Sequence, residues 1–310
     1  MDTPNITKAE DYSNRKIDAL RSAFSSLGLD GGISIVTVGS LARREASEQS
    51  DLDYFIICPD ADGDGEVRNK INSCIAQLEI RPPSSSGAFA TSVSPENLKR
   101  AIGGSSESND ELTRRMLFLL ESDWLYGREV YEELFADLIS LYIKNGITQH
   151  QLARFFLNDL IRYYRTICVD FEYKTCDGGK SWGDRNIKLL FSRKLLYFSG
   201  IVAVAGTAQS SCEFKKSELT RLLKMTPINR VKDSCGGDSD RLMARYDAFL
   251  GWMSDVGVRG RLRETSSDRN AHSDEFRAMK NAGHHFSWDI ENLLHRCFAQ
   301  THPIYQALFL

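Results

Sequence analysis

Apolar residues near the start of the chain recur at the spacing of one helix face. Ile17, Leu20, Phe24 and Leu27 lie three or four positions apart within residues 7–27. Side chains at that spacing share one stripe of an α-helix, so the segment predicts an amphipathic helix that covers a core.

Two largely apolar runs follow, at residues 33–38 (ISIVTV) and 52–58 (LDYFIIC). Their length and their β-branched and aromatic content predict buried strands. Further elements are expected as a short helix over 41–47, a longer helix over 67–78, and strands over 78–80 and 89–93.

Beyond residue 94 the pattern is almost entirely helical. Ser108 and Glu111 have the spacing of a capping box, in which each residue satisfies a backbone amide at a helix start. The chain therefore predicts a small α/β unit in front and an α-helical unit behind. Helices are expected at about 112–120, 128–144, 148–171, 184–199, 215–226, 238–256 and 273–298.

Composition narrows the class of protein only a little. The 310 residues are 42% hydrophobic and 26% charged, which is ordinary for a soluble globular protein, and the net charge of −3 leaves room only for a local basic patch. The N-terminus has no apolar signal core, and the longest apolar runs fall short of the ~20 residues that a membrane span requires. We therefore expect a cytoplasmic protein without a membrane segment.

Cysteine and histidine spacing gives no support to a structural metal site. The seven cysteines are scattered and form no CxxC pair, and the histidines show no HExxH pattern. Most of the cysteines are expected to be small buried apolar residues, with no disulfide framework.

The chemistry is concentrated between the first two predicted strands. Gly39 and Ser40 follow the first strand, and Asp51 and Asp53 lead into the second. Glycine lets the backbone turn sharply and approach a phosphate, while the serine hydroxyl can donate to a phosphate oxygen. Two carboxylates two residues apart on a strand share one face and form a hard oxygen site suited to Mg²⁺.

This order of strand, Gly-Ser, short helix and Asp-x-Asp strand resembles the DNA polymerase β-like nucleotidyltransferase superfamily. The resemblance is sharpest over residues 33–58 and is nearest to the protein-PII uridylyltransferase branch. Residues 112–127 are similar to the helix that follows the catalytic sheet in that branch. The resemblance implies an α/β (α+β) fold, with a mixed-sheet catalytic domain at 1–146 and an α-helical domain at 147–310.

The same resemblance implies transfer of a nucleoside monophosphate from a triphosphate such as ATP, with release of pyrophosphate. Gly39 and Ser40 would touch phosphate. Asp51 and Asp53 would be catalytic and bind Mg²⁺, with Mn²⁺ as an alternative ion. The acceptor is left open among a protein, an RNA such as tRNA, a small molecule and a second nucleotide, and the oligomeric state is open.

Two further features near the motif have alternative interpretations. Many members of the superfamily carry a third carboxylate on a later strand, and Glu79 is the candidate here, either as a catalytic residue or as a solvated strand residue. Arg43 and Arg44 follow the Gly-Ser turn, where one can reach a phosphate or the acceptor and the other can lie on a solvated helix face. Arg43 is the nucleotide-binding candidate.

A second basic segment lies in the predicted helical domain. Arg185 and Lys188 are three residues apart and so share a helix face, with Lys174 preceding them. In related enzymes the helical unit supplies a cation to the triphosphate, so these three are nucleotide-binding candidates, against the alternative of ordinary surface charge. Trp182 can stack on a base or pack beneath a loop, and the glycines nearby do not form a P-loop.

The sequence thus predicts a Mg²⁺-dependent nucleotidyltransferase. An alternative is a catalytically silent, nucleotide-sensing or antitoxin-like binding protein of the same fold, favoured by the uncertain third carboxylate. A third interpretation is a helical interaction protein in which the Gly-Ser and Asp-x-Asp matches are accidental.

Overall fold

The computed structural model describes residues 2–29, 31–59, 65–78, 80–81, 92–100, 102–176 and 181–309. The chain forms two compact units. The sheet unit comprises Ala9–Gln149 and Ser210–Thr226, and the helical unit comprises Met1–Lys8, His150–Gln209 and Pro227–Leu310. The predicted division into domains 1–146 and 147–310 stays a prediction. The two compact units differ from it, since residues 210–226 belong to the sheet unit.

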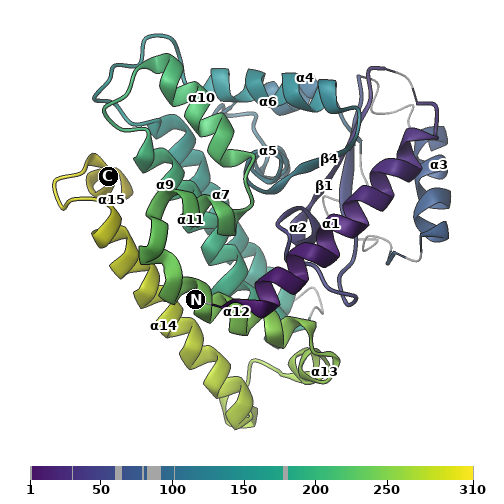
Figure 1. Ribbon diagram of the computed structural model, residues 1–310, viewed down its shortest axis with the longest axis vertical. Coiled ribbons are helices and arrows are strands. Elements are labelled where there is room, and N and C mark those ends of the chain that lie inside the picture. The colour runs from purple at the N-terminus through teal and green to yellow at the C-terminus, as the bar shows by residue number, and fades with distance from the viewer. Residues whose placement is uncertain are drawn as a thin grey trace. The chain divides into compact units, whose positions relative to one another are not determined.

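The sheet unit is built on four strands in the order β3-β2-β1-β4. β1 pairs antiparallel with β2 and with β4, whereas β2 and β3 are parallel, so the sheet is mixed, as predicted. The strands are β1 (Ser34–Val38), β2 (Asp53–Ile57), β3 (Ser92–Val93) and β4 (Asp123–Tyr126) (Figure 1).

The structure corrects two of the strand and helix predictions. Leu78 lies in a turn and Ile80 lies outside any strand, so the described ends of the predicted strand 78–80 are not extended sheet. The predicted strand over 89–93 is confirmed at its described end, where Ser92–Val93 form β3 parallel to β2 after the crossover through α3 (Gly65–Gln77). Residues 123–126 are the edge strand β4, not part of a helix that continues to 127.

Helices cover both faces of the sheet. On one face, α1 (Pro4–Ser25) and α3 pack on a core that includes Leu20, Phe24, Tyr54 and Ile75. On the other face, α5 (Asn109–Glu121) brings Phe118 to 6.5 Å from Phe55, measured between ring centroids. Figure 1 shows α1 crossing in front of β1, with α10 beside α6. The remaining helices of this unit are α2 (Gly39–Ala42), α4 (Pro95–Lys99), α6 (Arg128–Tyr142) and α10 (Cys212–Leu223).

The capping box predicted at the start of α5 is confirmed. The Ser108 hydroxyl accepts a hydrogen bond from the Glu111 amide at 3.2 Å, and the Glu111 carboxylate accepts one from the Ser108 amide at 2.8 Å. Both contacts lie within one turn of chain, which is why the local sequence was sufficient to predict them.

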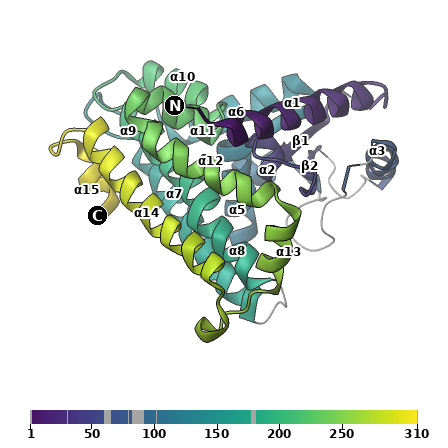
Figure 2. The same cartoon turned by 60° about the horizontal axis from the view of Figure 1, so that its bottom comes forward.

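The helical unit packs around α9 (Lys194–Gly206), whose residues are almost all buried. Phe191 stacks on Phe249 with ring centroids 4.9 Å apart, and α14 runs beside α12 (Figure 2). The predicted helix starting at 148 begins only at Arg154. The other elements are α7 (Arg154–Cys176), α8 (Trp182–Lys188), η1 (Leu189–Arg193), α11 (Pro227–Cys235), η2 (Gly236–Ser239), α12 (Asp240–Ser254), α13 (Val256–Glu264), η3 (Arg269–Ala271), α14 (Asp274–Cys297) and α15 (Pro303–Phe309).

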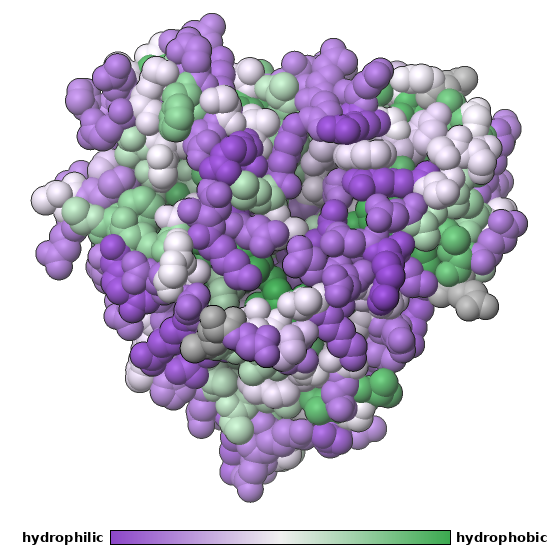
Figure 3. Space-filling view, viewed as in Figure 1, coloured by the Kyte–Doolittle hydropathy of each residue, from purple (hydrophilic) through white to green (hydrophobic). Residues whose placement is uncertain are grey.

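α8, η1 and α9 join into one helical stretch, Trp182–Gly206, which is longer than any of the apolar runs noted in the sequence. By length and composition this stretch could cross a membrane, but 67% of its most apolar window is buried inside the protein. A buried core helix passes the same test, so the stretch is weak evidence for a membrane span. On the face in Figure 3, hydrophilic residues predominate and hydrophobic residues form separate small patches.

Candidate nucleotide-binding site

The site begins where β1 ends. Val38, the last residue of β1, pairs with Asp53, the first residue of β2. Gly39 then turns the chain with φ of +71°, in the left-handed region that favours glycine, and begins α2. The register therefore places the Gly-Ser turn directly beside the aspartate at the start of the neighbouring strand.

Gly39 and the carboxylate of Asp53 are in close contact. A β-carbon added at Gly39 would lie 2.7 Å from Oδ2 of Asp53 and 3.4 Å from its Cβ. Any other residue at position 39 would therefore push against the carboxylate as well as adopt an unfavourable φ. Ser40, the next residue, is partly buried at the same bend.

Asp51 and Asp53 flank the buried Leu52. Leu52 and Tyr54 lie in the core under α1, so Asp53, the first residue of β2, points away from that core, and Asp51 lies just before the strand. Asp51 is exposed, and Asp53 is partly buried. The Thr37 hydroxyl donates to the Asp53 carbonyl at 3.0 Å, which fixes the backbone of β2 at this point.

The donor set fits a hard divalent cation. Mg²⁺ in phosphoryl-transfer sites is commonly held by one or two carboxylates, with water and substrate phosphates completing the coordination. Asp51 and Asp53 would supply two such carboxylates, and Gly39 lies directly beside the second of them. Among the residues that the structure describes, no group of three or more His, Cys, Asp or Glu side chains is arranged to hold a metal ion.

Glu79, the predicted third carboxylate, lies outside the described residues, so its role stays a prediction. The chain nearby passes close to the site, since the Arg81 carbonyl accepts a hydrogen bond from the Leu52 amide at 3.0 Å. The strand parallel to β2, Ser92–Val93, carries no carboxylate.

Arg43 and Arg44 are both engaged inside the sheet unit, so neither lies on a solvated helix face. Arg43 is only 5% exposed, and its guanidinium donates to Glu45 at 2.8 Å and also to Glu121 of α5. Arg44 contacts Asp123 of β4 at 2.5 Å. Phosphate binding by Arg43 stays a prediction, and its ion pairs give it a structural role that the sequence did not indicate, because Glu121 is 78 positions away.

Two of the three basic candidates of the helical unit pair with an acidic residue. Lys174 pairs with Asp170 at 2.7 Å, and Lys188 pairs with Asp184 at 2.7 Å. Burial lowers the pKa of Lys188, an effect that the Asp184 carboxylate opposes. Arg185 lies in the same helix, α8, and is partly buried.

Trp182 packs within the helical unit. Its ring stacks on His272 with centroids 5.4 Å apart, and it lies 5.7 Å from the ring of Phe276 and 6.3 Å from that of Phe171. These contacts support the packing interpretation of this residue.

Two residues that the sequence did not single out contact site residues that are distant in the chain. Thr37 holds the Asp53 backbone, and Glu121 holds Arg43, yet neither belongs to a recognisable motif. Only their position after folding identifies them.

The strand, glycine turn and aspartate-bearing strand together have the arrangement of a nucleotidyltransferase core. Residues 17–83, about a fifth of the chain, match the model of the nucleotidyltransferase domain family. This match contains α1 from Ile17 onward, the Gly-Ser turn and both aspartates, and it supports the nucleotidyltransferase superfamily. No curated protein matches the chain.

Proposed function

We propose that this protein is a Mg²⁺-dependent nucleotidyltransferase that transfers a nucleoside monophosphate from a nucleoside triphosphate to an acceptor hydroxyl. The observation that carries the proposal is the contact between the Gly39 turn and the Asp53 carboxylate, within the segment that matches the nucleotidyltransferase domain family. Of the acceptors left open by the sequence, those that carry a hydroxyl fit this reaction.

Some residues of the site position the triphosphate, and others balance its charge. Gly39 lets the backbone approach the triphosphate, and the Ser40 hydroxyl donates to a phosphate oxygen. Asp51 and Asp53 would hold the cation, and the chemistry that such a cation would supply is positive charge beside the reacting phosphate. Lys174, Arg185 and Lys188 are retained as candidate triphosphate ligands, and Glu79 as the candidate base for the acceptor hydroxyl.

The alternative function is nucleotide binding without turnover. It is favoured by the absence of a carboxylate from β3 and of any three-acid group in the described part of the chain. Two carboxylates can hold one cation and a triphosphate, whereas activation of an acceptor hydroxyl calls for an additional base.

One experiment separates these functions. The protein is incubated with each of the four α-³²P-labelled ribonucleoside triphosphates, Mg²⁺ and cell lysate, with pyrophosphate release measured in parallel. Label transfer that is lost in Asp53→Asn supports the transferase, and mass spectrometry of the labelled product then identifies the acceptor. Saturable triphosphate binding with neither label transfer nor pyrophosphate release supports the silent binding protein.

The absence of any triphosphate binding in the presence of Mg²⁺ would contradict both functions. A transferase that labels a small regulatory protein would support the protein-PII uridylyltransferase branch suggested by the sequence, and a labelled RNA or small molecule would contradict it.

A further inference from the structure

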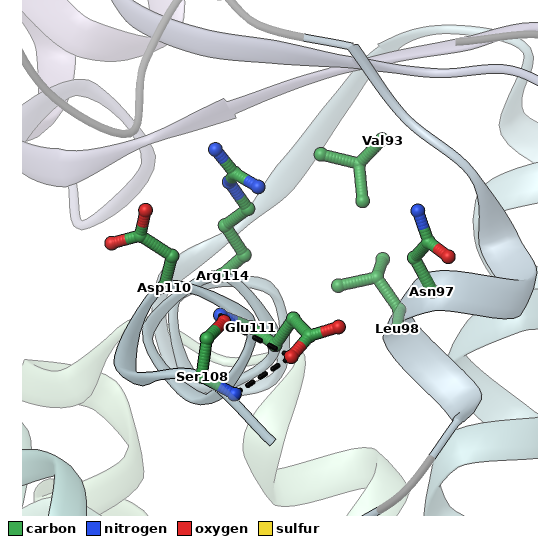
Figure 4. Close-up of a pocket in the computed structure, with 7 residues that line it drawn as sticks. All are labelled: Val93, Asn97, Leu98, Ser108, Asp110, Glu111 and Arg114. Atoms are coloured by element: carbon green, nitrogen blue, oxygen red, sulfur yellow. Dashed lines mark hydrogen bonds between the residues drawn. The ribbon is translucent and has the colours of Figure 1, made fainter. Parts of the chain in front are cut away.

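A cavity of about 260 Å³ lies in the sheet unit, apart from the Gly39 turn. It is bounded by β3 and α4 and by the first turns of α5 (Figure 4). Its volume is below the roughly 300–1,000 Å³ of sites that take drug-sized ligands, so it has room only for a smaller molecule. The residues that line it are Val93, Asn97, Leu98, Ser108, Asp110, Glu111 and Arg114.

Arg114, which lines the cavity, has one hydrogen-bond donor without an acceptor. Its side chain is partly buried, and Nε is shielded from solvent and has no hydrogen-bond partner among the residues that the structure describes. Across the residues that the structure describes, the Arg114 guanidinium makes no ion pair either, although Asp110 lies one helical turn earlier. A shielded donor without a partner costs folding free energy, so an arginine of this kind is explained when a ligand supplies the missing acceptor.

Negative charge on another side of the cavity limits what that ligand can be. Glu111 lines the cavity; its Oε2 accepts hydrogen bonds from the amide and hydroxyl of Ser108 at 2.8 and 3.0 Å, and its Oε1 lies 3.9 Å from the Arg100 guanidinium. Figure 4 shows Arg114 and Glu111 extending from α5 on two sides of the space that faces Leu98 and Val93. A polyphosphate would meet the carboxylates of Glu111 and Asp110, which both line the cavity, whereas a ligand with one anionic and one cationic group can pair with both kinds of charge.

The rest of the lining is mixed in character. Leu98 and Val93 are almost fully buried and form an apolar floor, and the Asn97 amide is exposed at the rim. A short apolar side chain would fit against that floor, with the amide available for one hydrogen bond.

We propose that this cavity binds a small zwitterion of the α-amino acid class, with its carboxylate on Arg114, its ammonium group on Glu111 and its side chain against Leu98 and Val93. Arginine binds carboxylates well because its planar guanidinium can donate two parallel hydrogen bonds.

The site is separate from the candidate phosphate site, although both lie on the same face of the sheet. Val93 pairs with Ile57, four residues along β2 from Asp53, which corresponds to about 13 Å at 3.3 Å per residue. An amino acid in the cavity does not span that distance. The proposal therefore stands independently of nucleotidyl transfer.

The test measures binding by isothermal titration calorimetry on the full chain, without nucleotide. The ligands are the twenty L-α-amino acids, the matching carboxylic acids without the amine, the matching amines without the carboxylate, and inorganic phosphate. The variants are Arg114→Gln, Asn97→Trp, which fills the cavity from its exposed rim, and Arg15→Gln as a control at an exposed arginine of α1.

At least one amino acid is expected to bind saturably, with affinity lowered about tenfold or more in Arg114→Gln and in Asn97→Trp and unchanged in Arg15→Gln. Analogues lacking either charged group should bind at least about tenfold more weakly than the parent. If Arg114→Gln fails to fold, Asn97→Trp carries the same test. The proposal is overturned if no amino acid binds, if both cavity variants bind normally, or if phosphate or a simple carboxylate binds as well as the amino acid.

Discussion

Gly39 lies so close to Asp53 that a β-carbon on the glycine would stand 2.7 Å from the Oδ2 atom of the aspartate. The backbone of the turn and the first carboxylate of β2 are therefore in direct contact, without an intervening side chain. A phosphate bound at the turn would lie beside that carboxylate, which is where a shared cation would be needed.

Replacing Gly39 with alanine is expected to lower both stability and nucleotide binding. The positive φ and the contact with Asp53 together cost about 1–3 kcal/mol, and the displaced carboxylate weakens the cation site. Urea unfolding and triphosphate titration with Mg²⁺ measure the two effects. Gly65→Ala is the matched control, because an added β-carbon there meets nothing within 4 Å, and an equal response of the two variants would contradict the prediction.

Asp51→Asn and Asp53→Asn are each expected to reduce Mg²⁺-dependent transfer by about 100-fold or more, since each removes a charged ligand that acts on the reacting phosphate. Chelation of divalent ions should produce the same loss in the unmodified protein. Initial rates of label transfer are the measurement, with circular dichroism to verify the fold. Asp18→Asn, at an exposed position of α1, should retain full activity. Normal rates in both site variants would rule out the proposed cation site.

Arg43→Met is expected to destabilise the sheet unit by about 3–5 kcal/mol, because it removes a buried cation that pairs with the carboxylates of Glu45 and Glu121. The free energy of unfolding in urea, compared with that of Arg15→Met at an exposed helix position, tests this role. A loss below about 1 kcal/mol would show that the ion pairs contribute little, and would favour a role for Arg43 at the phosphate.

Glu111 is expected to contribute a pH-dependent share of stability. Hydrogen bonds from the Ser108 amide and hydroxyl lower the pKa of its carboxyl group. Its contribution is therefore fully present above the ordinary glutamate pKa and is lost as the pH falls through the lowered value. Unfolding free energies of the unmodified protein and Glu111→Gln should converge as the pH is lowered from 6 to 3. A difference that stays constant across that range would mean that the charge of Glu111 does not matter.

The parts of the protein that could be predicted from sequence are those specified by neighbouring residues. The apolar runs at β1 and β2, the Gly-Ser turn between them and the Ser108–Glu111 capping box each depend on a few adjacent positions. Residues 123–126 could not be read as β4 in the same way, because a four-residue edge strand is defined by its pairing with β1 about 90 positions earlier.

The same distinction applies to the candidate sites. The sequence alone determined which residues could bind phosphate and metal, since the order of glycine, serine and two aspartates carries that chemistry. Only the tertiary structure decided that Gly39 touches Asp53, that Arg43 is enclosed by two carboxylates, and that Nε of Arg114, beside a cavity, has no acceptor among the residues that the structure describes. Those facts depend on pairing and packing between segments far apart in the chain, and no local pattern of residues encodes them.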